Sequence, residues 1–503
     1  MKNIWFIFTI YLSLFSTNTF GKVENQFKDT LVIAQRSDVK TLDPQKSIDT
    51  VSNKVINLMF ESLLTLDENL NITPQIATSW EQVDDLNTIF HLREGIIFHN
   101  GENLTSEDVV FSLNRARASA QVGYNFTPII NVQAIDKYTI QITTDKPFGA
   151  MLKYLSSVGG AIVSKKAVDE LGNNFSQNPI GSGPYKFKEW ISGDKITVEA
   201  FDNYYGEIPK NKTLIVRSIP EVTNRTIALE TGEVDIAFDI GIMDRETIKD
   251  SSDLELLEVE APSTLYLGFD NTTPLFQNKK LREAIAYAID NESLAEFVFR
   301  GAALSGDSPI PPVIDVYNPN VKKYPQDIVL AKQLMKEAGF ENGLNIELWT
   351  SAQSTWIDMC TIIQDQLKEI GITAEIKIFE WSTYVTITSQ PNKALYLLSW
   401  NISSVDGDPA LYPLFHSNEK GMSGNRSFYE NKEIDSLLLE ARTTVDQNKR
   451  KDLYFKAQEI IQNELPHYTL VYPHYNLGAR KAVKNLVLQK NGFTDLAKTY
   501  VLK

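Results

Sequence analysis

The first part of the chain mixes strand-like and helix-like patterns of hydrophobic residues. Leu31–Gln35 is a short apolar run of strand length, and Thr88–Arg93 alternates apolar and polar positions as a half-buried strand does. The pattern over Val51–Leu64 predicts a helix. Thr105 and Asp108 have the spacing of a capping box, which predicts that another helix begins there.

Helices and strands continue to alternate through the rest of the chain. Further strands are predicted at Tyr185–Trp190, Lys195–Ala200, Leu214–Ile219, Val234–Phe238, Leu265–Phe269, Ile346–Thr350, Thr373–Phe379 and Ala394–Ser399. Further helices are predicted at Thr223–Glu230, Leu281–Ile289, Ser293–Phe299, Ile328–Ala338, Trp356–Ile370 and Asn448–Asn463. This alternation is typical of α/β lobes built on mixed sheets.

The first 21 residues have the pattern of a Sec signal peptide. Lys2 precedes the apolar run Ile4–Phe15, and Thr19 and Gly21 are small residues placed for cleavage. The alternative is a membrane anchor, but this run is too short for a hydrocarbon core that needs about twenty residues. We therefore expect export, with a mature chain that begins near Lys22.

Charge and cysteine content limit the partners and the compartment. A formal charge of −15 argues against binding to nucleic acid or to anionic membranes. Cys360 is the only cysteine, so an intrachain disulfide and a lipid-modified cysteine after the signal are both excluded. We expect a soluble periplasmic monomer that is not inserted in the membrane, with Cys360 buried among apolar residues.

A chain of 503 residues is too long for one small core and fits two or three packed domains. Changes in pattern and turn clusters divide it into two lobes and a small module. The predicted boundaries are 1–21 for the signal, 22–64, 178–263 and 476–503 for lobe I, 65–177 for the small module and 264–475 for lobe II.

A series of short motifs follows in a fixed order. The most specific part runs from Ile76–Trp80 through Phe90–Gly95 and Phe98–Gly101 to Glu107–Ser112. The other motifs are Thr41–Pro44, Gly181–Tyr185, Arg225 with Gly232–Asp235, Leu281–Asp290, Trp400–Pro409 and Ala457–Gln458. Together they resemble the peptide/nickel-type (family 5) solute-binding proteins of ABC importers, in particular the dipeptide-, oligopeptide- and glutathione-binding branch.

The resemblance implies an α/β fold, a two-lobed periplasmic-binding-protein clamshell with mixed sheets and an additional small third domain. It also implies a function: delivery of a peptide-like ligand to the permease subunits of an ABC transporter, without catalysis and without a cofactor. A receptor for haem or a nickel complex is the alternative within the family, with His416 as a candidate contact. A secreted hydrolase is the alternative outside it, although the five histidines have no zinc-binding spacing.

The loop Trp400–Pro409 is the first candidate for the ligand site. A receptor that encloses a zwitterionic peptide must compensate its ammonium, because an unpaired buried charge is costly. The resemblance implies that an aspartate of this loop pairs with the ligand's α-amine, and Asp406 and Asp408 are both candidates. The choice between them stays open, and an Asp-Gly or Asp-Pro turn is the structural alternative.

The resemblance implies further contacts and one departure. Asp49 and Thr50 are expected on the opposite wall, where Thr50 either binds a peptide backbone or caps the following helix. Trp400 and Trp381 are candidates for stacking on ligand side chains. The loop Ser351–Thr355 has no basic residue where dipeptide receptors bind the ligand carboxylate, which argues against strict dipeptide selectivity.

Overall fold

The structure is a computed structural model that describes residues 26–402 and 404–503. The predicted signal peptide therefore lies outside the described residues. Among the residues described, every helix is too short or too polar to cross a bilayer.

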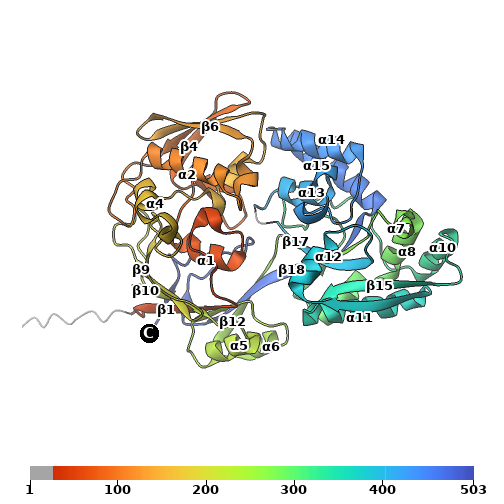
Figure 1. Cartoon of the computed structure of the whole chain (residues 1–503). Helices are drawn as coiled ribbons and strands as arrows, with labels where there is room; N and C mark the ends of the chain where they lie inside the picture. Colours follow the sequence, from red (N-terminus) through yellow and green to blue (C-terminus); the bar gives the residue numbers. More distant parts are fainter. Residues whose placement is uncertain (1–25, 403) are drawn as a thin grey trace, which may run out of the picture.

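Two lobes lie side by side and share one long strand, β18 (His467–Arg480) (Figure 1). The first half of β18 pairs with β13 (Ser263–Gly268) of lobe II, and its second half pairs with β11 (Ile236–Phe238) and β12 (Leu254–Glu260) of lobe I. The chain crosses between the lobes again at Ala261, whose N–H donates to the carbonyl of Pro473 at 3.1 Å. These two adjacent crossings form the connection between the lobes.

Lobe I is built on a mixed sheet in the order β11-β1-β10-β9-β8, in which β1 (Thr30–Gln35) runs parallel to both of its neighbours. The other strands are β8 (Tyr185–Ile191), β9 (Lys195–Ala200) and β10 (Thr213–Ser218). Its helices include α1 (Thr50–Met59), α4 (Lys165–Leu171), α5 (Val222–Glu230) and α6 (Arg245–Asp250). Residues 161–175 contribute to this core although the sequence grouped them with the small module; the domain boundaries themselves stay a prediction.

Lobe II continues the sheet as β16-β15-β17-β13, with β15 parallel to both neighbours. Its strands are β14 (Ala303–Ser305), β15 (Leu344–Ser351), β16 (Ile372–Phe379) and β17 (Leu395–Asn401). Its longer helices are α8 (Lys279–Ala288), α10 (Ile328–Glu337), α11 (Ser354–Glu369), α12 (Trp381–Thr388), α13 (Gly407–Phe415), α14 (Lys432–Arg442) and α15 (Gln447–Glu464). Cys360 is buried in the core of this lobe, as predicted, and burial raises the pKa of its thiol to about 12.

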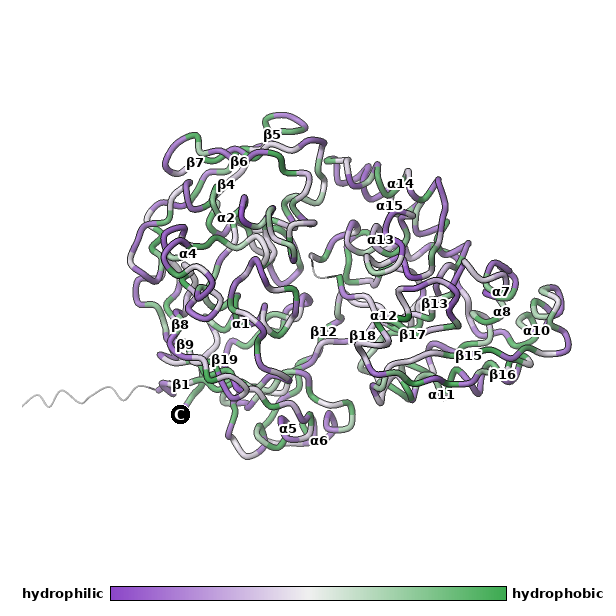
Figure 2. Tube along the Cα trace, viewed as in Figure 1, coloured by the Kyte–Doolittle hydropathy of each residue, from purple (hydrophilic) through white to green (hydrophobic). Residues whose placement is uncertain are grey.

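The small module has its own core beneath the four-stranded antiparallel sheet β4-β5-β7-β6, drawn at the top of Figure 1. The module comprises β4 (Ala77–Gln82), β5 (Asn87–Leu92), β6 (Ile129–Asp136), β7 (Thr139–Thr144), α2 (Ser106–Ala118) and α3 (Met151–Leu155). The capping box of α2 forms as predicted, since Asp108 accepts from the N–H of Thr105 at 3.0 Å. Figure 2 shows apolar and polar positions interleaved along the elements, the pattern of elements that bury one face.

Most predicted elements occur within a few residues of their predicted bounds, but helix α1 ends at Met59, five residues before the prediction. The cause is tertiary packing. The N–H of Gly183 donates to the carbonyl of Met59 at 2.9 Å, and a Cβ on Gly181 would lie only 1.9 Å from that carbonyl oxygen. The Gly181–Tyr185 turn therefore packs directly on the end of the helix, which only glycine permits.

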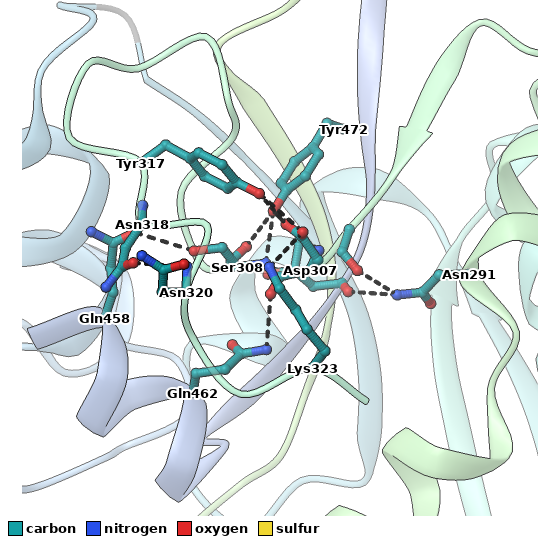
Figure 3. Close-up of polar contacts among 12 residues, drawn as sticks. Asn291, Asp307, Ser308, Tyr317, Asn318, Asn320, Lys323, Gln458, Gln462 and Tyr472 are labelled. Carbon is teal, nitrogen blue, oxygen red and sulfur yellow. Dashed lines mark hydrogen bonds and ion pairs between the residues drawn. The ribbon is translucent and has the colours of Figure 1, made fainter. Parts of the chain in front are cut away.

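A polar network ties a proline-rich segment of lobe II to β18 beside the crossing (Figure 3). The hydroxyl of Tyr472 accepts from the N–H groups of Asp307 and Ser308 at 3.1 and 2.8 Å. The Asp307 carboxylate accepts from Tyr317 at 2.9 Å and from Lys323 at 2.6 Å. These hydrogen bonds hold the segment around Asp307 against β18 at the point where the strand continues from lobe II into lobe I.

Glu61 is a buried acid directly after α1. Its carboxylate accepts from the hydroxyls of Tyr204 at 2.9 Å, Tyr205 at 2.8 Å and Ser182 at 3.3 Å. Burial raises the pKa of Glu61 to about 7 despite these hydrogen bonds.

We predict a pH-dependent stability from this residue. Between pH 4.5 and about 7 the folded protein keeps a proton on Glu61 that the unfolded chain has released, so stability should fall as pH rises through this range. Glu61 contributes at most about 1.4 kcal/mol per pH unit to the dependence of the unfolding free energy on pH. Urea unfolding across this range should show that Glu61→Gln removes this contribution and that Glu81→Gln, at an exposed position, does not. An unchanged slope in Glu61→Gln would assign it to another group.

Candidate ligand-binding site

A cavity of about 140 Å³ lies between the lobes. Lobe I contributes the start of α1 and the C-terminal segment around Asn491, the small module contributes residues near α3, and lobe II contributes Asn401 and Ser404. Tyr475 and Pro262 belong to the two crossings and also line it. The cavity is therefore bounded by parts that a pivot at the crossings would move relative to each other.

The start of α1 forms one wall. Thr50, Asn53 and Asn57 lie three and four residues apart and line the cavity together, as one helix face does. Asp49 is the N-cap: its carboxylate accepts from the N–H of Ser52 at 2.9 Å and from its hydroxyl at 2.8 Å. The capping function thus belongs to Asp49, which leaves Thr50 facing the cavity.

The two predicted tryptophans have contacts within lobe II. Trp400 Nε1 donates to the carbonyl of Pro409 at 2.8 Å, and its ring packs against the apolar cores of the lobe. Trp381 is half-exposed at the start of α12, edge-on to Trp356. Neither is among the described residues that line the cavity.

Asp406 forms a buried ion pair. Its two carboxylate oxygens accept from the guanidinium of Arg450 at 2.7 and 2.5 Å. One of them also accepts from the N–H of Asp408 at 2.8 Å, which makes Asp406 the N-cap of α13. Burial acts to raise the pKa of Asp406, but Arg450 holds it below its ordinary value, so the carboxylate is charged.

Asp408 is also buried and engaged. One oxygen accepts from the hydroxyl of Tyr154 at 3.0 Å, and the other lies 3.3 Å from Nε of Arg442. Burial raises the pKa of Asp408, and Arg442 opposes the shift. Both predicted acids thus have partners inside the protein, and neither is among the described cavity-lining residues. Their role as amine anchors stays a prediction.

Contacts across the cleft hold the small module against lobe II. Tyr154 belongs to α3 of the module, whereas its partner Asp408 belongs to lobe II. Leu70, on a turn of the module, is buried in the apolar cluster of lobe II around α13 and α15. Gly149 donates to the carbonyl of Arg442 at 3.2 Å, and a Cβ there would lie 2.2 Å from the carbonyl of Thr444. The structure therefore represents a form in which module and lobe are in contact.

Of the predicted site residues only Thr50 lines the cavity, and Lys153 is one of the lining residues that sequence reasoning missed. It is the single charged side chain among the described residues that line the cavity. It lies in α3, which no pattern predicted, and nothing in its neighbourhood distinguishes it from other lysines of the sequence. The loop Ser351–Thr355, which has no basic residue, is not among the described lining residues.

The haem or nickel alternative named His416 as a candidate contact. Within residues 26–402 and 404–503, no three His, Cys, Asp or Glu side chains gather as metal ligands would. His416 is buried, stacks on Tyr412 and accepts from the N–H of Asn418 at 3.1 Å. These are structural contacts of the segment after α13.

Two lobes joined by paired crossings, with a polar cavity between them, define the class of binding proteins that close on a ligand by a hinge. Comparison with known proteins supports this class. Residues 71–422 match the family described as bacterial extracellular solute-binding proteins, family 5 Middle. The glutathione-binding protein GsiB of Escherichia coli is 32% identical over 453 residues, which cover 88% of each chain.

Solved structures agree. The periplasmic binding protein DppA from Helicobacter pylori, in complex with the peptide STSA, superposes with a TM-score of 0.81 at 28% identity, covering 95% of this chain and 99% of the other. NikZ from Campylobacter jejuni, in complex with Ni(L-His), gives a TM-score of 0.81 at 25% identity, covering 94% and 99%. The chain belongs to the family 5 bacterial extracellular solute-binding proteins. The predicted fold class and family are confirmed.

Proposed function

We propose that this protein binds a peptide-like solute in the interlobe cavity and delivers it to the permease subunits of an ABC importer. The observation that carries the proposal is the lining of that cavity, in which hydroxyl and amide side chains such as Thr50, Asn401 and Ser404 predominate. Such groups match the N–H and C=O groups of a peptide backbone. The named ligands of GsiB and DppA support the same class.

The protein gently purified from its native compartment provides the direct test. Closed receptors retain ligand, so native mass spectrometry should detect a bound species of peptide mass that denaturation releases. Calorimetry with that species should then give saturable binding, and small-angle scattering should show a smaller radius of gyration when it is bound. If calorimetry with this species shows no saturable binding, and the radius of gyration does not change when it is added, the proposal is wrong.

We place the protein in the periplasm as a monomer with the segment 1–21 removed. The support is the N-terminal pattern, the description of the family as extracellular and the fact that DppA is a periplasmic binding protein. Mass analysis of the exported protein should give an N-terminus near Lys22. A protein that retains residues 1–21 or fractionates with membranes would contradict this assignment.

A nickel-complex receptor is the second candidate, favoured by the resemblance to NikZ. A metal bound with its own organic ligand needs no protein metal cluster, so the described residues do not argue against it. Purified protein should then contain stoichiometric nickel by elemental analysis, and peptides should not compete for the cavity. Catalysis has no support from the family, whose members are described as binding proteins.

A further inference from the structure

The interlobe cavity offers a ligand one cation and no free carboxylate among its described lining residues. The cation is Lys153, beside the hydroxyl groups of Ser156 and Ser157. The two acids predicted from the sequence, Asp406 and Asp408, pair with Arg450 and with Tyr154 and Arg442, respectively. A ligand ammonium could reach either carboxylate only by breaking a contact within the protein.

The ammonium of Lys153 has unused hydrogen-bonding capacity. Nζ donates to the carbonyl of Leu70 at 2.5 Å, and no described carboxylate lies at ion-pair distance from it. An ammonium has three donors, so two remain for a ligand or for water. Burial lowers the pKa of Lys153, and the carboxylates of Asp315, Asp406 and Asp67 oppose the shift from beyond ion-pair distance.

We propose that Lys153 binds a carboxylate of the ligand, and that the cavity selects peptide-like ligands by this group rather than by a free amino group. The inference rests on the proposed function, since it assumes a peptide-like ligand in this cavity. A ligand carboxylate at Lys153 supplies the direct ion-pair partner that the described carboxylates, which lie beyond ion-pair distance, do not supply. Charge-assisted hydrogen bonds are strongest when closure excludes water, so this pair forms its best contact in the ligand-bound state.

The position of Lys153 couples selection to closure. Its ammonium is held by the carbonyl of Leu70, whose side chain is buried in lobe II. Its neighbour Tyr154 contacts Asp408 of lobe II. A carboxylate bound at Lys153 therefore lies next to the two contacts that join the small module to that lobe.

The test uses the mature protein and a defined mixture of di- to pentapeptides in three forms: free, C-terminally amidated and N-terminally acetylated. Native mass spectrometry identifies the peptides retained, and calorimetry measures the tightest. For the wild type, amidation should weaken binding about 10–100-fold, the range expected for one charge-assisted hydrogen bond, whereas acetylation should change it by less than about 3-fold.

Variants assign the effect to the side chain. Lys153→Met should weaken binding of the free peptide about as much as amidation does, and amidation should then cause little further loss. Lys153→Arg keeps the charge and should retain part of the affinity. Lys165→Met, at an exposed position of α4, is the matched control and should bind like the wild type. Thermal melts of each variant exclude misfolding as the cause.

Three results would contradict either the role of Lys153 or the peptide-binding function on which it rests. If amidation leaves affinity unchanged in the wild type, Lys153 does not select by the carboxylate. If acetylation abolishes binding, the ligand is held by its amine and the predicted role of Asp406 or Asp408 replaces ours. If no peptide of any form binds the wild type, the proposed peptide-binding function itself fails.

Discussion

Replacing Asp406 by asparagine is expected to destabilise the protein by about 3–5 kcal/mol, because it leaves the Arg450 guanidinium buried without a counter-charge. Asparagine is as good an N-cap as aspartate, so the start of α13 is preserved and the loss reports the charge pair. Chemical unfolding of the mature protein measures the change. The control is Glu440→Gln, which breaks the exposed Glu440–Lys449 pair on the neighbouring helices and should cost no more than about 1 kcal/mol.

The double variant Asp406→Asn with Arg450→Met should lose less unfolding free energy than the two single variants lose together, because it removes both buried charges. Ligand titrations of the same variants test the prediction made from the sequence. If Asp406→Asn folds with wild-type stability but loses free peptide and keeps its affinity for an N-acetylated one, Asp406 is an amine anchor. A stability loss with unchanged peptide preference assigns it to the scaffold.

Leu70→Ala is expected to weaken ligand binding about 10–50-fold with little change in thermal stability. Leu70 extends from the small module into the apolar cluster of lobe II, so its burial exists only while module and lobe are in contact. Truncating a buried leucine costs about 2 kcal/mol or more, and here the cost falls on the closed form. A smaller closed population lowers the apparent affinity in proportion.

At a subsaturating ligand concentration, scattering should give a larger radius of gyration for Leu70→Ala than for the wild type, and at saturation the two should agree. Val83→Ala, on an exposed turn of the same module, is the matched control. Alanine at position 70 keeps the positive φ of 66° that leucine already adopts, so added backbone strain is not a competing cause. Unchanged affinity would show that the Leu70 contact does not stabilise the ligand-bound form.

The local sequence pattern predicted helices and strands well where their bounds are set by residues a few positions away in the chain. Strand β9 occupies Lys195–Ala200 as predicted, and α2 begins at the predicted capping box. The alternation of these elements, with the ordered motifs, was sufficient for the fold class and the family. Each of these signals is short-range, because side-chain periodicity and capping depend on residues within a few positions.

The candidate site depended on contacts that sequence spacing does not reveal. Asp406 meets Arg450 from another helix, and Asp408 meets Tyr154 from another module. The sequence around an aspartate in a turn does not distinguish a carboxylate that faces a ligand from one that pairs with an arginine of the protein. The loop Trp400–Pro409 does reach the cavity, but through Asn401 and Ser404 and not through its acids.

By itself the sequence determined most of the succession of helices and strands and the family, since these rest on local periodicity and ordered motifs. Only the tertiary structure decided where α1 ends, that β18 serves both lobes, and that Lys153 faces the cavity while Asp406 pairs with Arg450. The physical reason is that burial and charge pairing are settled between segments distant in the chain. A buried charge requires a partner, and packing alone determines which segment supplies it.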